Sequence, residues 1–163
     1  MEDNKKDVAD IAKMIKGQHV CMLTTINGGG QLHSRPMGVQ DVEFTGSLWF
    51  MTSDDTHKME EIERNSHACA AFSDESSSTY VCLSGDVTAT KDRAKIDEFW
   101  SPLYKAWFPQ GKDDPKITLL HLNVERAEYW DAPGGRMVQL LLIVKKAITG
   151  HGSEGSHGTV ELH

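Results

Sequence analysis

The sequence predicts a small antiparallel β-barrel, mainly β in content, with helices packed on its outside. Two observations lead to this fold class. Short runs of β-branched and apolar residues recur along the chain and are separated by turn sequences, as expected for six or seven strands in consecutive hairpins. Apolar residues at helical spacing occur at the ends of the chain and in the connections between these runs.

The length and charge of the chain limit the classes of protein it can be. Its 163 residues are most simply one domain over residues 1–150, followed by a flexible tail rich in Gly, Ser and His at 151–163. A formal net charge of -7 argues against a broad basic face for nucleic acid or an anionic membrane. The chain has no apolar run of the roughly 18–20 residues that cross a bilayer, and no signal-peptide core at its N-terminus. We therefore expect a cytoplasmic protein without a nucleic-acid or membrane partner.

Five extended runs in the first part of the chain predict strands. Each is rich in β-branched or apolar residues and is bounded by residues that favour turns. The runs are His19–Ile26, Gln31–Gln40, Ser47–Ser53, His67–Phe72 and Thr79–Asp92. Pro36 cannot donate a ladder hydrogen bond, so it marks an edge or a bulge, and Gly85 is the expected bend of the fifth run.

Two helices are expected among these strands. The apolar residues of segment 8–15 recur at helical spacing, and Gly17 is a suitable residue to end that helix. The second helix follows residues 54–56, all of which suit an N-cap, and it has Met59 and Ile62 on one face.

The remainder of the chain is expected to alternate helix and strand. Residues 93–108 have helical spacing of apolar residues, with Pro102 as a break. Two further strands are predicted at Ile117–Val124 and Arg126–Asp131. The apolar run 137–148 favours a last helix, because its apolar residues recur at i, i+4, i+7 and i+11.

Arg35 and Lys58 are the first candidates for ligand binding. Arg35 lies on the second extended run and Lys58 in the first turn of the following helix, so two cations come near a helix N-terminus, where phosphate groups bind well. Arg offers a planar fork to phosphate oxygens and Lys a mobile point charge. Thr52 and Ser53 add hydroxyl donors at the end of the preceding strand. Taken alone, an Arg on an edge strand and a Lys on a helix are more typical of a solvated surface.

Two carboxylates stand next to this candidate site. Asp54 and Asp55 directly precede the helix that contains Lys58, and a carboxylate repels phosphate. We therefore expect both to cap the helix with their charges turned outward.

Four segments in a fixed order resemble one known family. They are RPM at Arg35–Met37, LWFMTS…HK at Leu48–Lys58, YVCLSGDVTAT at Tyr80–Thr90 and AEYWD at Ala127–Asp131. Together they resemble the FMN-binding split β-barrels, and specifically the general stress protein 26 group of the pyridoxamine 5′-phosphate oxidase-like family. The resemblance covers roughly residues 5–150.

This resemblance implies a flavin site. Members of the family are homodimers with two flavins at the subunit interface, so we expect FMN, with FAD as the alternative. By resemblance, Arg35 and Lys58 hold the flavin phosphate with His57 beside them, and Tyr80 lies near the position of a polar side chain that faces the ring. The backbone of Pro36, Met37 and Gly38 is expected along the ring, and Met51 and Thr52 are expected at the same site.

The activity is left open by these residues. The segment GGRMVQLLLIVKK does not match the Arg- and His-bearing C-terminal segment of true pyridoxamine phosphate oxidases, and His57 stands where they have an Arg, so oxidation of vitamin B6 is not expected. No residue is a persuasive general acid or base, and none is assigned as catalytic. The alternatives are an oxidoreductase with a nicotinamide electron donor, a stress-response flavin carrier without turnover, and a heme- or F420-binding barrel.

The remaining aromatic, cysteine and histidine residues have simpler interpretations. The aromatic group Trp100, Tyr104, Trp107 and Phe108 is either a wall over the flavin or a dimer contact, or a helix that packs on the core. The three widely spaced cysteines are expected to be reduced core residues. The histidines have no paired spacing on one helix face, so no metal site is predicted.

Overall fold

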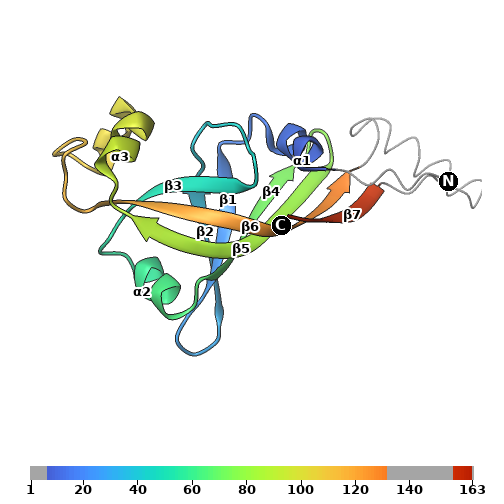
Figure 1. Cartoon of the computed structure of the whole chain (residues 1–163), viewed down its shortest axis with the longest axis horizontal. Coiled ribbons are helices and arrows are strands. Elements are labelled where there is room, and N and C mark those ends of the chain that lie inside the picture. The colour runs from blue at the N-terminus through green and yellow to red at the C-terminus, as the bar shows by residue number, and fades with distance from the viewer. Residues whose placement is uncertain (1–6, 132–155, 163) are drawn as a thin grey trace, which may run out of the picture.

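The computed structural model describes residues 7–131 and 156–162. Figure 1 shows an elongated arrangement of strands with α1 and α3 near opposite ends. The helices are α1 (Val8–Ile15), α2 (His57–Arg64), α3 (Arg93–Phe99) and a 3-10 turn, η1 (Pro102–Ala106). The strands are β1 (Val20–Ile26), β2 (Leu32–Gly38), β3 (Ser47–Ser53), β4 (His67–Asp74), β5 (Thr79–Thr90), β6 (Ile117–Asp131) and β7 (Ser156–Glu161).

The described strands form one seven-stranded antiparallel sheet. Its order is β2-β1-β4-β5-β6-β3, with β7 paired to β6 outside this path. The sheet coils but does not close, because β2 and β3 end the path without pairing with each other. The predicted split barrel of six or seven antiparallel strands is confirmed. Pro36 lies on β2 at the end of the path, as its missing N–H predicted.

Helix α1 forms where the apolar spacing predicted it. Asp7 is its N-cap, and the side chains of Asp7 and Asp10 each accept a hydrogen bond from the other's backbone N–H, as in a capping box. Ile11 and Ile15 are buried against the sheet. The helix therefore covers one end of the barrel core and leaves the opposite end to α2 and α3 (Figure 1).

The long strand β6 replaces two shorter predicted strands. Residues 117–131 form one continuous strand that pairs with β3, β5 and β7. The register of β5 on β6 shifts between Ser84 and Gly85, where Glu125 of β6 is the extra, unpaired residue, so the position predicted as a bend lies opposite a bulge. A Cβ at Gly85 would overlap the carbonyl oxygen of Asn123, which explains why glycine occupies this position.

Strand β7 corrects one expectation from composition. Residues 151–163 were expected to be a loosely held tail, yet Ser156–Glu161 pairs with β6, and Val160 is buried in the core. Pairing with an available strand edge decides the structure of such a segment, and its Gly/Ser/His content does not reveal this. The predicted helix at 137–148 lies outside the described residues.

The core consists of two clusters, and both bear on the candidate site. The main cluster fills the barrel and includes Phe50, Leu83 and Leu122. The second lies where α3 packs on β3 and β6, and includes Met51, Phe99 and Phe108. Pro102 separates α3 from η1, as predicted, so the chain turns there and brings the aromatic residues after it towards β3.

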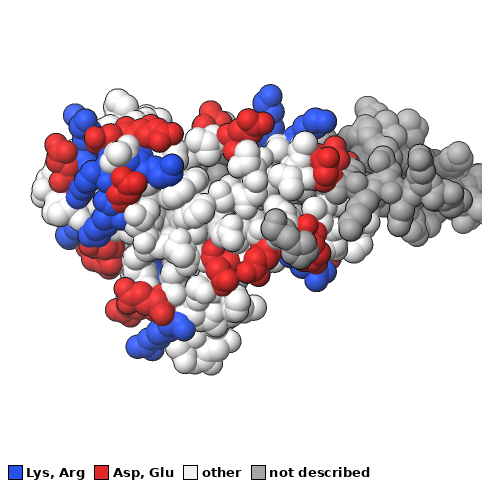
Figure 2. All heavy atoms as spheres, viewed as in Figure 1, with Lys and Arg blue, Asp and Glu red and all other residues white. Residues whose placement is uncertain are grey.

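The surface charges are of mixed sign. Figure 2 shows Lys and Arg interspersed with Asp and Glu around α3, with largely uncharged side chains over the middle of the same face. In the described part of the chain, no helix is long and apolar enough to cross a membrane.

Candidate functional site

Arg35 is held from two sides of the barrel. It lies on β2 opposite Leu23 of β1. Its Nη1 donates to Thr25 Oγ1 at 2.6 Å and to the Leu23 carbonyl at 3.4 Å, and its Nη2 donates to Glu61 Oε2 at 2.9 Å. Its side chain is 23% exposed. The guanidinium therefore lies between β1 and α2, with one edge still accessible.

Glu61 is the buried partner of this arginine. Its side chain is 8% exposed on α2 and accepts hydrogen bonds from Thr25, from Arg35 and from His33 Nδ1, the last at 2.7 Å. Burial alone raises the pKa of Glu61. The hydrogen bonds and the charge of Arg35 outweigh burial and lower the pKa from 4.5 to about 2. Glu61 is therefore ionised at neutral pH, and both of its oxygens are engaged.

Lys58 is the second cation of the predicted pair. It lies in the first turn of α2 and is half-buried. Burial and the neighbouring Arg35 charge lower the pKa of Lys58, whereas Asp55 raises it. No residue in the described ranges forms an ion pair with Lys58. The structure thus brings Arg35 and Lys58 together, with the lysine ammonium available to an anion.

Two adjoining cavities contain nearly all of the predicted site residues. A cavity of about 590 Å³, the α2 cavity, is lined by His33, Ser34, Arg35, Thr56, His57, Lys58, Glu60 and Glu61. A cavity of about 690 Å³, the β3 cavity, is lined by Pro36, Met37, Gly38, Met51, Thr52, Ser53, Asp55, Thr56, Lys58, Tyr104, Trp107, Phe108, Pro109, Gln110, Asp114, Pro115 and Lys116. Thr56 and Lys58 line both cavities, so the start of α2 is the wall between them.

The predicted residues divide between these cavities by type. The cations and His57 lie at the α2 cavity. The segment 36–38 and the end of β3, Met51 to Ser53, lie at the β3 cavity. Tyr80 is the exception. It is 40% exposed on β5, opposite Trp130 of β6, and borders neither cavity.

An aromatic wall closes the β3 cavity on the side of η1. Tyr104, Trp107 and Phe108 line it together. Phe108 is buried in the second core cluster, whereas Trp107 is 72% exposed. The sequence left open whether this group packs on the core or forms a wall. In the structure Phe108 packs on the core and Trp107 lines the cavity, while the wall over a flavin and the dimer contact stay predictions.

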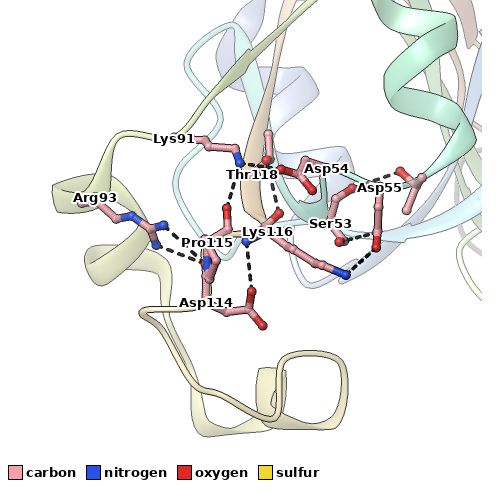
Figure 3. A network of polar contacts seen from close by, with 10 residues as sticks. Ser53, Asp54, Asp55, Lys91, Arg93, Asp114, Pro115, Lys116 and Thr118 are labelled. Atoms are coloured by element: carbon pink, nitrogen blue, oxygen red, sulfur yellow. Dashed lines mark hydrogen bonds and ion pairs between the residues drawn. The ribbon is translucent and has the colours of Figure 1, made fainter.

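Asp54 and Asp55 are neutralised by lysines and do not cap α2. The N-cap is Thr56, and its side chain makes no capping hydrogen bond, so the expectation of aspartate caps was wrong. Asp54 pairs with Lys91, and Asp55 pairs with Lys116 at 2.9 Å (Figure 3). The two lysines come from the end of β5 and from just before β6. The strand pairing brings them beside the aspartates, and local sequence does not predict that contact.

These ion pairs belong to a wider polar network at the rim of the β3 cavity. Figure 3 shows Ser53 directed at Asp55 and Arg93 directed at the backbone near Asp114. Hydrogen bonds from Ser53 and Lys116 lower the pKa of Asp55. The carboxylate that could repel a phosphate is thus ionised but already paired with the Lys116 cation.

The sequence reasoning missed the groups that hold Arg35. Thr25 and Glu61 had no assigned role, since a Glu in the middle of a short helix is most often solvated. One available signal was the spacing of Lys58 and Glu61, which lie three residues apart and thus on one face of α2. Lys116 and Gln110 of the β3 cavity were also not predicted. Among the described residues, no group of three or more His, Cys, Asp or Glu could hold a metal ion.

Comparison with known proteins identifies the family of the chain. The family model described as pyridoxamine 5′-phosphate oxidase like matches residues 6–154. General stress protein 26 of Bacillus subtilis (strain 168) is 32% identical over 131 residues, which cover 76% of this chain and 86% of that protein.

Two solved structures extend the likeness to the fold. A protein assigned as general stress protein 26 from Jannaschia sp. CCS1 is 28% identical, with a TM-score of 0.76 over 94% of this chain and 99% of that chain. The general stress FMN/FAD binding protein from Xanthomonas citri is 28% identical, with a TM-score of 0.68 over 79% and 91% of the two chains. The chain belongs to the pyridoxamine 5′-phosphate oxidase-like family, among relatives of general stress protein 26.

Proposed function

We propose that this protein binds a flavin, FMN in preference to FAD, and uses it as an oxidoreductase with a reduced nicotinamide as electron donor. The observation that carries the proposal is the convergence of Arg35 and Lys58 on the α2 cavity, directly beside the larger β3 cavity with its aromatic wall. A ligand with a phosphate at one end and a planar ring at the other suits this pair of cavities. The Xanthomonas citri relative, described as FMN/FAD binding, supports the same ligand class.

The residues of the chain would bind and orient the cofactor. Arg35 and Lys58 supply the donors for a phosphate, and the hydroxyls of Thr52 and Ser53 add polar contacts where β3 ends. The aromatic wall excludes water from the ring side of the site. A bound flavin supplies hydride and single-electron chemistry, and the protein supplies position and electrostatics.

Binding can be tested by titrating the protein with FMN, FAD and riboflavin and following flavin fluorescence. We expect FMN to bind most tightly and Lys58→Ala to weaken FMN about tenfold, while riboflavin, which lacks the phosphate, is unaffected. Lys13→Ala is the matched control, because Lys13 is 79% exposed on α1 and borders neither cavity. Equal affinity for FMN and riboflavin would contradict a phosphate role for Lys58.

Turnover needs a separate measurement, because binding alone is also the behaviour of a carrier. We expect the flavin bands of the loaded protein to bleach rapidly when NADH or NADPH is added without oxygen. Bleaching by neither nucleotide would instead identify a stress-response flavin carrier. The visible spectrum of the protein as isolated distinguishes flavin from heme or F420.

The outer face of the sheet supports a homodimer as part of the same proposal. Met22, Ala71, Cys82 and Glu128 are register partners across β1, β4, β5 and β6, so their side chains share one face. Four large apolar or aromatic side chains are exposed on these strands, namely Val20, Met22, Tyr80 and Trp130. Pro36 of the β3 cavity pairs with Met22, so this face adjoins the cavity. A second copy placed here would bury the face and bring its own Tyr80 towards the ring.

A charge at the centre of this face tests the dimer. We expect Met22→Glu to convert the protein to monomers in light scattering coupled to size-exclusion chromatography, and to weaken flavin binding at the same time. Leu103→Glu is the control, because Leu103 is 80% exposed on η1, which is not part of the sheet. A dimer that persists in Met22→Glu would refute this placement of the interface.

A further inference from the structure

A buried carboxylate forms part of the wall of the cationic α2 cavity. Glu61 is 8% exposed, yet it borders the cavity together with Arg35 and Lys58. A negative charge at a site for phosphate weakens binding unless it has a compensating effect. Glu61 therefore needs an explanation that the simple pairing of two cations does not give.

Formal charge alone gives this cavity little attraction for an anion. Its charged lining consists of Arg35 and Lys58 against Glu60 and Glu61, which sum to zero when the two histidines are neutral. A phosphate monoester carries about -1.5 to -2 charges at pH 7. Recognition in such a cavity depends on the direction of hydrogen-bond donors more than on net charge.

The contacts of Arg35 show how its donors are divided. Arginine has five N–H donors. The described residues engage three of them, through the Leu23 carbonyl, Thr25 Oγ1 and Glu61 Oε2. The Nε–H and one Nη2–H remain without a partner in the described chain. These two donors lie on neighbouring nitrogens and form the kind of fork that binds two oxygens of one phosphate.

Glu61 is itself fixed by its neighbours. His33 Nδ1 donates to Oε1, while Thr25 and Arg35 donate to Oε2. Thr25 is fully buried and contacts both Arg35 and Glu61, so the three side chains form a closed group. Rotation of the guanidinium would break two of these contacts at once.

We propose that Glu61 is a positioning residue that holds Arg35 with its free N–H edge towards the α2 cavity, and so makes this cavity selective for a phosphate monoester. The proposal rests on the proposed function in so far as that monoester is the phosphate of FMN. Glu61 contributes through Arg35 and makes no contact with the ligand itself.

The neighbouring residue Glu60 provides a matched control. Glu60 borders the same cavity but is exposed, and no ion pair with it occurs in the described chain. Glu60→Gln and Glu61→Gln each remove one negative charge from the wall. If only charge matters, both variants bind FMN more tightly. We expect opposite signs: Glu60→Gln lowers the Kd of FMN about twofold, and Glu61→Gln raises it about tenfold.

A double-mutant cycle with Arg35 tests whether Glu61 acts through the guanidinium. Glu61→Gln is expected to lose its effect on the Kd of FMN in an Arg35→Lys background. Arg35→Lys keeps a cation beside the buried Glu61 and removes the planar fork, so this variant is expected to fold. A tenfold loss caused by Glu61→Gln that persists in the Arg35→Lys background would overturn the proposal, because the loss would then come from general damage to the site.

A second ligand separates this proposal from the flavin proposal. Phenyl phosphate binding is followed by the NMR signal of the Arg35 Nε–H, which is expected to shift in the wild type and to be absent or unresponsive in Glu61→Gln. If the wild type binds phenyl phosphate in this way but does not bind FMN, the positioning role of Glu61 stands and the flavin proposal is refuted. If the wild type and Glu61→Gln bind FMN with equal affinity, the flavin proposal stands and the positioning role is refuted.

Discussion

Replacement of Glu61 by Gln should change the acid stability of the protein in a defined pH window. Glu61 has a pKa of about 2 in the folded protein and 4.5 as its ordinary value. A folded-state pKa below the ordinary one means that ionised Glu61 stabilises the fold above about pH 4.5. This contribution is lost as the pH falls from 4.5 towards 2.

The size of the contribution follows from the same two values. One pKa unit equals about 1.4 kcal/mol, so the full difference corresponds to about 3 kcal/mol. Solvent in the adjoining cavity screens the interaction, and we therefore expect about 2 kcal/mol. Glu61→Gln should be less stable than the wild type by this amount at pH 7, and the gap should shrink towards zero near pH 2.

Urea unfolding followed by circular dichroism at pH 7, 5, 4, 3 and 2.5 measures this gap directly. Glu60→Gln is the control, because the exposed Glu60 should give a gap below about 0.5 kcal/mol at every pH. A gap between wild type and Glu61→Gln that does not change with pH would refute the reasoning. The destabilisation would then come from lost packing and would not come from the charge of Glu61.

Three further predictions concern single positions of the fold and of the cavity wall. Gly85→Ala should lower the free energy of unfolding by more than about 2 kcal/mol in urea titration, because its Cβ would overlap the backbone of Asn123. Gly29→Ala is the control: a Cβ at Gly29 makes only an ordinary contact at 3.5 Å, so the free energy of unfolding should change by less than about 0.5 kcal/mol. Phe108→Ala should destabilise the fold by about 3 kcal/mol, since Phe108 is buried in the second core cluster. Trp107→Ala should leave stability unchanged but weaken FMN binding several-fold in the fluorescence titration, because Trp107 lines the β3 cavity and is 72% exposed. Equal losses of stability in both variants would show that Trp107 belongs to the core.

The strands could be predicted because their cause is local. Alternation and β-branched content set off β1 to β5 from their turns, and Gly85 and Pro36 have only a few roles open to them within a sheet. The extent of β6 was harder to predict, since the polar pair Glu125-Arg126 interrupts an otherwise apolar run. The two apparent strands are one because β5 pairs along almost their whole length, and Glu125 at the interruption is the extra residue of a bulge in β6.

Strand β7 could not be predicted from its own residues. Its pairing with β6 depends on an edge that forms far away in the sequence. Gly158 shows the constraint most clearly, because a Cβ there would overlap the ring of Tyr129. Gly158 was part of the composition that predicted a flexible tail, yet in the structure it allows β7 to pack closely against the side chain of Tyr129.

The candidate site was predictable as a set of residues but not as a set of contacts. Arg35, Lys58 and the end of β3 were identified from their order, and the structure places them around two adjoining cavities. The ion pair between Arg35 and Glu61 was not identified, because a contact between β2 and α2 leaves no local pattern in the sequence. Asp54 and Asp55 show the same limit, since their lysine partners follow them by 37 and 61 residues.

These contacts change what a phosphate site in this fold requires. From the sequence, Arg35 and Lys58 were two positive charges, and the nearby carboxylates were expected to repel a phosphate. In the structure, each of Asp54, Asp55 and Glu61 has its own cation, whereas no described residue forms an ion pair with Lys58. Charge is therefore nearly balanced around the site, and Lys58 together with the free edge of Arg35 remains to attract an anion. Such a site binds a ligand with phosphate oxygens at one fixed position more tightly than it binds other anions, because only that ligand accepts hydrogen bonds from the fixed N–H donors of Arg35.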